Sequence, residues 1–267
     1  MPCYESINEK LLPLALVSVI VTTVVAQGTL TPPSPSGSKD GLATGAIANA
    51  KKIPRAKRAA MANRRNLPRA TPLRVKPGSG KNLLNNEAAT EQEAVLGYFV
   101  AQRSQFASLA YGLLKNSAVA DQIEPLAKLY EGTKLAQLIR ATVKVLRAGG
   151  EDEKKTQADL DQILATLQYA YEKKGEAATY HFAVGGSSAI LVCVGLLLDS
   201  QDIPPKSQEI FTSLQSKLAG IVANAPKETN SALKSAAENV SVAKLKSKDD
   251  VFKAFNNLNA AYKKATD

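Results

Sequence analysis

Few side chains in this sequence of 267 residues have the chemistry that catalysis requires. The only histidine is His181, and the two cysteines are Cys3 and Cys193. A Cys–His pair would have to join Cys193 to His181, and on one helix these positions lie about 18 Å apart, beyond the reach of proton transfer. The sequence contains no nucleophile-elbow motif and no metal-ligand spacing. It therefore predicts a protein that is not an enzyme, with no metal site and no cofactor, in which His181 is a hydrogen-bonded packing residue.

A basic, acid-poor segment near the N-terminus has the chemistry of a protease substrate. Residues 28–82 hold 12 Lys and Arg, one Asp and seven Pro, and this excess accounts for the whole net charge of +10. Such a segment buries too little apolar surface to offset chain entropy, so we expect residues 27–84 to be disordered. Within it, Arg55-Ala56-Lys57-Arg58 matches the R-x-K-R site of furin-like or Kex2-like proprotein convertases. The sequence predicts cleavage after Arg58 by such a protease, with Arg55, Lys57 and Arg58 as the recognised side chains.

A second short motif in the same segment concerns targeting. Arg65-Asn66-Leu67-Pro68-Arg69 lies some forty residues after the predicted signal cleavage site. It resembles, in a degenerate form, the R-x-L host-targeting motifs of secreted effectors from eukaryotic parasites and oomycetes, with Arg65, Leu67 and Arg69 as the motif residues. The resemblance implies a secreted virulence effector whose partner is a protein inside or on a host cell.

Two other functions of the basic segment stay open. Its Arg-rich composition behind a signal peptide also fits the plastid transit peptide of a complex alga. Its positive charge would also bind phospholipid headgroups or other polyanions through counterion release. No aromatic side chain lies between Thr29 and Asn82, so stacked bases would have no platform. We therefore expect no nucleic-acid partner.

Gly78-Ser79-Gly80-Lys81 resembles half of a phosphate-binding loop. The full pattern needs Gly at the position of Val75 and Ser or Thr at that of Asn82. We therefore assign no phosphate site to these residues.

The N-terminus has the pattern of a signal peptide. Leu11 to Ala26 is an apolar run preceded by Lys10, and a stretch rich in Pro, Ser and Gly follows Gln27. Sixteen residues are short for a membrane span and typical of a signal-peptide core. We predict a cleaved signal peptide over residues 1–26 and a secreted protein, with an uncleaved membrane anchor as the alternative.

Residues 85–267 form a neutral domain with helical periodicity. From Leu83 onward the chain has 21 basic and 21 acidic residues, and apolar side chains recur at helical spacing. We expect an all-α fold, a bundle of five to seven helices, with residues 119–147 forming one helix that begins or breaks near Pro125. Ser247 and Asp250 match a capping box at the start of the last helix. Asn239, in Asn-Val-Ser, is a candidate glycosylation site.

The most apolar stretch of this domain, residues 183–198, has three interpretations. It is a short transmembrane helix, a fully buried central helix of the bundle, or one arm of a membrane-inserting hairpin. In a soluble bundle its small residues either allow close helix packing or leave a cavity for a fatty acid or sterol. The candidate residues for a core, ligand-binding or membrane-spanning role are Gly185, Gly186, Leu191, Cys193 and Leu197.

Together these observations predict a secreted, non-enzymatic helical binding protein with a protein partner, released by signal-peptide and proprotein-type cleavage. The alternative is a lipid-binding or membrane-associated helical protein that uses residues 183–198. In that alternative the chain would be a single-pass membrane protein or would hold a lipid.

Overall fold

The computed structural model describes residues 73, 76–84, 89–149, 152–198 and 201–266. The described residues confirm the all-α class, with eight α-helices, two short 3-10 helices and no strand. The 3-10 helices are η1 (Lys81–Leu84) and η2 (Ser117–Val119). The α-helices are α4 (Glu91–Leu114), α5 (Ala120–Leu129), α6 (Lys134–Arg147), α7 (Glu153–Glu172), α8 (Glu176–Leu197), α9 (Pro205–Ala223), α10 (Ser231–Ser241) and α11 (Lys248–Thr266).

The described residues form eight α-helices, one more than the seven expected at most. The difference arises because residues 119–147, expected to form one helix, form the two helices α5 and α6. Pro125 lies inside α5 and does not interrupt it. The break comes after Leu129, where Gly132 has a positive φ of 83° and Thr133 caps the next helix by accepting a hydrogen bond from the amide of Ala136. Glycine adopts this backbone conformation without steric cost, so the turn at Gly132 separates α5 from α6.

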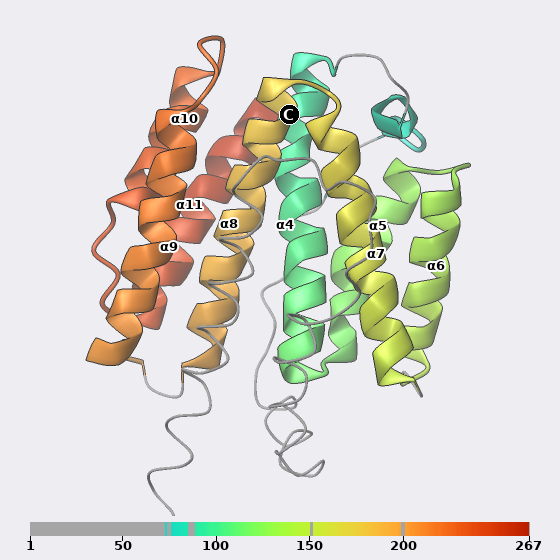
Figure 1. Ribbon diagram of the computed structural model, residues 1–267, viewed down its shortest axis with the longest axis horizontal. Coiled ribbons are helices and arrows are strands. Elements are labelled where there is room, and N and C mark those ends of the chain that lie inside the picture. Colours follow the sequence, from blue (N-terminus) through green and yellow to red (C-terminus); the bar gives the residue numbers. More distant parts are fainter. Residues whose placement is uncertain (1–72, 74–75, 85–88, 150–151, 199–200, 267) are drawn as a thin grey trace, which may run out of the picture.

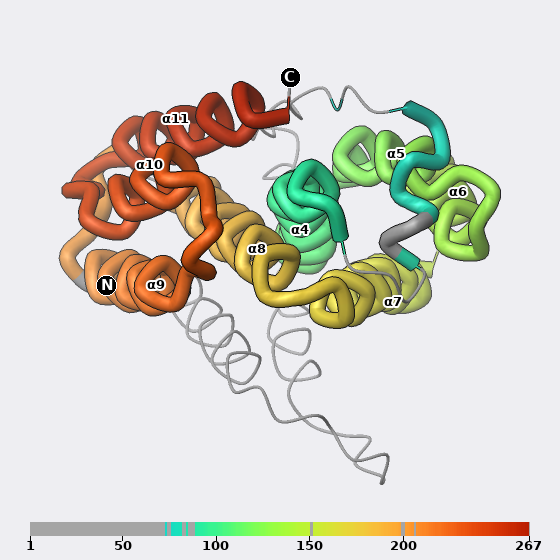
Figure 2. Tube along the Cα trace, turned by 90° about the horizontal axis from the view of Figure 1, so that it is seen from above, coloured from blue at the N-terminus to red at the C-terminus, as the bar shows by residue number. Residues whose placement is uncertain are grey.

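Helices α4 and α8 lie side by side at the centre of the bundle (Figures 1 and 2). Both are buried around most of their circumference, as expected of helices that are apolar on all faces. Gly185 of α8 permits their close approach, because a Cβ at this position would overlap the backbone carbonyl of Tyr98 in α4. Helices α5, α6 and α7 pack on one side of this central pair, and α9, α10 and α11 pack on the other.

Local signals define several helix ends. Thr90 and Glu93 form a capping box at the start of α4. The capping box predicted for the last helix is confirmed, because the amide of Asp250 donates to Ser247 Oγ (3.2 Å) and the amide of Ser247 donates to Asp250 Oδ2 (2.9 Å). Gly149, with φ of 96°, follows the end of α6.

The last residues of the basic segment belong to the folded unit. Residues 76–84, here called the 76–84 clasp, lie at the C-terminal end of α5. The amide of Gly78 donates to the carbonyl of Lys128 (3.0 Å), and the amide of Gly80 donates to that of Leu129 (2.9 Å). Carbonyls at a helix C-terminus lack partners within the helix, so the clasp supplies them. The prediction that residue 84 lies outside the folded domain is therefore corrected: the domain includes Lys76.

Candidate functional site

A buried polar cluster joins α4, α8 and α11. Tyr98 Oη donates to Asn259 Oδ1 (2.6 Å), and Gln102 Nε2 donates to the same oxygen (2.6 Å). The rings of Tyr98 and Tyr262 stack, with centroids 3.7 Å apart and planes inclined by 13°. His181 Nδ1 lies 2.8 Å from Tyr262 Oη, so these two groups share a hydrogen bond. His181 is thus the hydrogen-bonded packing residue that the sequence predicts.

Burial favours the neutral forms of His181 and Cys193. Burial lowers the pKa of His181 to about 4, because the imidazolium ion would lose its hydration. Burial raises the pKa of the Cys193 thiol, for the same reason applied to a thiolate. Both residues lie on α8, twelve positions apart, so the helix axis alone separates them by about 18 Å. They do not form a Cys–His pair. Among the described residues, no group of three or more His, Cys, Asp and Glu could hold a metal ion.

The residues singled out in segment 183–198 all lie on α8. Gly185 packs against α4, whereas a Cβ at Gly186 would meet no atom within 4 Å. Leu191 and Cys193 are buried, and Leu197 is half-buried against the α9–α11 side. The small residue at Gly185 therefore serves close helix packing, one of the two roles expected for it.

Helix α8 has the length and hydropathy of a membrane span, and no other helix among the described residues does. In the bundle, 78% of its apolar window is buried, as in the central helix of a soluble bundle. The described structure therefore has the buried-helix arrangement, and the membrane interpretations stay predictions.

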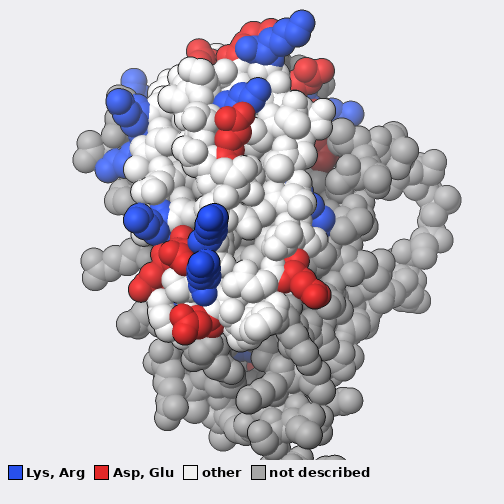
Figure 3. Space-filling view, turned by 90° about the vertical axis from the view of Figure 1, so that its left-hand side faces the viewer, with Lys and Arg blue, Asp and Glu red and all other residues white. Residues whose placement is uncertain are grey.

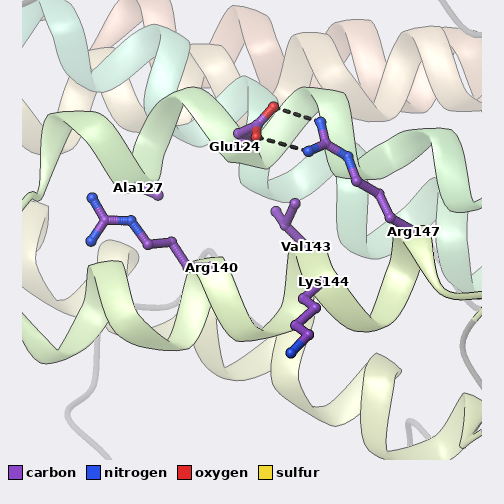
Figure 4. A pocket seen from close by; sticks show the side chains of 6 residues that line it. All are labelled: Glu124, Ala127, Arg140, Val143, Lys144 and Arg147. Carbon is purple, nitrogen blue, oxygen red and sulfur yellow. Dashed lines mark hydrogen bonds and ion pairs between the residues drawn. The ribbon is translucent and has the colours of Figure 1, made fainter.

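The first surface pocket lies between α5 and α6 and has a volume of about 320 Å³. Arg147 forms a two-pronged ion pair with Glu124, at 2.7 and 3.0 Å, and a longer one with Asp121 at 3.4 Å. Figure 4 shows Arg140 and Lys144 pointing away from this pair. The pocket residues are Glu124, Ala127, Arg140, Val143, Lys144 and Arg147.

Helix α6 supplies most of this rim and contains four basic residues and no acid. It lies at the outer end of the bundle, and no other described helix packs on its outward face (Figure 2). Of the basic side chains of this pocket, Arg140 is paired with Glu131 (3.0 Å) and Arg147 with Glu124 and Asp121, so Lys144 is the one without an ion-pair partner among the described residues. Guanidinium and ammonium groups in this arrangement can bind carboxylates of a partner.

The second surface pocket lies between α10 and α11 and has a volume of about 340 Å³. Asn239, the candidate glycosylation site, is exposed and lies on its rim. The other residues of the pocket are Ala236, Val240, Ala243, Lys244, Leu245, Asp250, Lys253, Ala254 and Asn257.

The processing and targeting residues lie outside the described residues. These are Arg55, Lys57 and Arg58, and Arg65, Leu67 and Arg69, together with the predicted signal peptide over residues 1–26. Cleavage and targeting at these positions therefore stay predictions of the sequence.

Sequence reasoning did not find the buried cluster, the clasp or the basic pocket. The Tyr98–Asn259 bond joins residues 161 positions apart, and no local pattern connects them. One signal was available for the basic pocket: α6 carries four basic residues without an acid inside an otherwise neutral domain.

No family model, no curated protein and no solved structure matches the chain.

Proposed function

We propose that this chain is a secreted, non-enzymatic helical binding protein whose folded domain recognises a protein partner. The observation that carries the proposal is the contrast between the buried His181 and Cys193 and the charged side chains around the α5–α6 pocket. His181 and Cys193 are buried and neutral. The α5–α6 pocket, by contrast, exposes Arg140, Lys144 and Arg147 around the apolar side chains of Ala127 and Val143. Interfaces commonly combine an apolar centre with a polar rim, so this pocket is suited to an acidic protein surface.

Delivery is the other part of the proposal. The signal peptide over residues 1–26 takes the chain into the secretory pathway, and a proprotein convertase cleaves after Arg58. The resemblance at Arg65, Leu67 and Arg69 supports an effector that acts in or on a host cell. The 76–84 clasp begins 18 residues after Arg58, so this cleavage leaves the described domain intact.

Sequencing the N-terminus of the protein secreted from eukaryotic cells tests delivery. We expect a mature N-terminus at Ala59 or shortly after Leu67. A product that begins at Gln27 would contradict proprotein cleavage, and retention in the cell would contradict secretion.

Charge reversal tests the binding surface. We expect the partner captured by the wild-type domain to be lost when Arg140→Glu and Lys144→Glu are combined. Lys263→Glu with Lys264→Glu on α11 is the matched control, because it changes the charge equally at exposed positions outside the pocket. Equal loss in both double variants would show a non-specific charge effect and contradict a site on α6.

One observation favours a second function. Helix α8 is long and apolar enough to cross a membrane or to line a lipid site. We expect, in that case, that organic extraction of the purified domain releases a fatty acid or sterol, or that the domain enters the detergent phase on phase separation. A lipid-free domain that stays in the aqueous phase would exclude this function.

A further inference from the structure

The chain contains a single Asn-X-Ser/Thr triplet in which X is not Pro, Asn239-Val240-Ser241. The triplet forms the last turn of α10. Asn239 is exposed, whereas Val240 is buried in the core of the α9–α11 side. Ser241 Oγ donates to the carbonyl of Glu238 (2.8 Å). Within the described part of the chain, the side-chain amide of Asn239 makes no hydrogen bond, so a substituent on its Nδ2 atom would break none.

The surface beside Asn239 is suited to a sugar. The α10–α11 pocket combines an apolar floor, which includes Val240, Leu245 and Ala254, with polar groups at its edge. The Asp250 carboxylate is held in place by the amides of Lys246 and Ser247, each at 2.9 Å. A pyranose ring has an apolar face and a polar edge, so it can contact both kinds of surface. The pocket volume of about 340 Å³ lies at the small end of the range for ligand pockets.

The surface around Asn239 also includes an exposed apolar side chain that a glycan would cover. Figure 3 shows the face over α9, α10 and α11, where charged side chains occur in small groups with uncharged surface between them. Val242, three positions after Asn239, is 75% exposed and is one of the two exposed large apolar side chains of the described residues. A glycan at Asn239 would cover this surface and increase solubility.

We propose that Asn239 carries an N-linked glycan whose first N-acetylhexosamine lies in the α10–α11 pocket. The donor is a lipid-linked oligosaccharide diphosphate. Asn239 Nδ2 forms a bond to C1 of the donor sugar while the bond from C1 to the diphosphate oxygen breaks. The amide loses one proton and the lipid diphosphate leaves, so no oxidant or reductant is needed. The transfer takes place on the unfolded chain during synthesis, and folding of α10 then places the sugar beside the pocket.

This proposal rests on the proposed passage through the secretory pathway. The test therefore expresses the full chain in eukaryotic cells twice, once with its own N-terminus and once with a heterologous signal peptide fused ahead of it. Failure of the chain to be secreted on its own contradicts the proposed function. The version with the added signal peptide enters the pathway in either case, so an unmodified Asn239 in that version overturns the glycan.

Mass spectrometry of the secreted protein is the first measurement. We expect one glycan, removed by peptide N-glycosidase and absent from both Asn239→Gln and Ser241→Ala. Ser241→Thr preserves the acceptor triplet and should keep the glycan. A protein that is secreted without a glycan, or a glycan that persists in Asn239→Gln, overturns the proposal.

The position of the first sugar is tested by trimming. An endoglycosidase that leaves one N-acetylhexosamine on Asn239 should leave the Tm unchanged, whereas the Asn239→Gln variant, which lacks the glycan and gains no charge, should have a Tm about 2–4 °C lower. An equal Tm of the trimmed protein and the Asn239→Gln variant overturns the placement of the sugar in the pocket.

Discussion

The two sides of the central α4–α8 pair are held to it by different kinds of buried polar contact. On the α9–α11 side, five side chains form one connected cluster across α4, α8 and α11 (Tyr98, Gln102, His181, Asn259 and Tyr262). On the α5–α7 side the polar contacts are separate: Arg103 donates to the carbonyl of Gln122, and Gln157 donates to Ser108 and Asp161. A connected network is satisfied in one arrangement only, whereas separate contacts can be lost one at a time. The α11 register should therefore depend on the cluster as a whole.

The largest effect should come from breaking the helix pair that both sides share. Gly185→Ala would place a methyl group against the carbonyl of Tyr98, which is backbone and cannot move without separating α4 from α8. We expect a loss of about 3 kcal/mol or more in the free energy of unfolding, measured in urea.

Gly186→Ala is the matched control for this substitution. A Cβ at Gly186 meets no atom within 4 Å, and alanine favours helices over glycine by up to about 1 kcal/mol. We expect Gly186→Ala to be neutral or stabilising. Equal stability of the two variants would show that α4 and α8 are not in close contact at Gly185.

The next largest effect is the pH dependence of stability that His181 causes on the α9–α11 side. The pKa of His181 is about 4 in the folded protein and near 6.5 when unfolded. Between these values the unfolded chain binds a proton that the folded protein does not, so stability falls as the pH falls. We expect a loss of about 2 kcal/mol between pH 6.5 and pH 5. His181→Asn should abolish most of this slope.

Hydrogen exchange at pH 5 should locate this effect. Because His181 bonds Tyr262 of α11, the amides of α11 should exchange faster while those of α5 and α6 change little. An identical pH slope in wild type and His181→Asn would assign the loss to carboxylates instead.

A single hydroxyl tests the connectivity of the cluster. Tyr98→Phe removes the donor to Asn259 and the acceptor for Gln102, so we expect a cost of about 1–2 kcal/mol in urea unfolding. Tyr180→Phe is the control, because among the described residues its buried hydroxyl has no hydrogen-bond partner. We expect that control to cost nothing. A Tyr98→Phe variant as stable as Tyr180→Phe would show that the cluster does not stabilise the α9–α11 side.

The smallest effect should be confined to the α5–α7 side. A Cβ at Gly80 would lie 2.8 Å from Leu129 Cγ and 2.9 Å from the ring of Tyr130, so Gly80→Ala loosens the 76–84 clasp. We expect a cost of about 1 kcal/mol and faster hydrogen exchange at the C-terminal end of α5, with α11 unchanged. Exchange that rises equally in α11 would contradict the independence of the two sides.

Much of the fold follows from local patterns. Apolar spacing predicts the helical class, and Ser247 with Asp250 predicts the start of α11. Of the three interpretations of residues 183–198, the buried central helix is the arrangement that α8 has in the described structure. These patterns succeed because hydrogen bonds and caps within a helix connect neighbouring residues.

The candidate sites were less accessible to the same reasoning. The spacing of twelve residues excluded a Cys193–His181 pair. The structure adds that both side chains are buried, which favours their neutral forms. The small apolar surface of residues 27–84 predicts disorder and gives no sign of the clasp, which instead depends on the backbone amides that Gly78 and Gly80 supply to the end of α5. Their small size is the feature that permits this contact.

The sequence by itself determined the all-α class, the capping box at the start of α11, the neutral charge of the domain and the separation of Cys193 from His181. It did so because these properties depend on residue types a few positions apart. Only the tertiary structure decided that Gly185 meets Tyr98, that His181 bonds Tyr262 and that Asn239 stands beside a pocket. These contacts join residues distant along the chain, and packing of the whole bundle selects them.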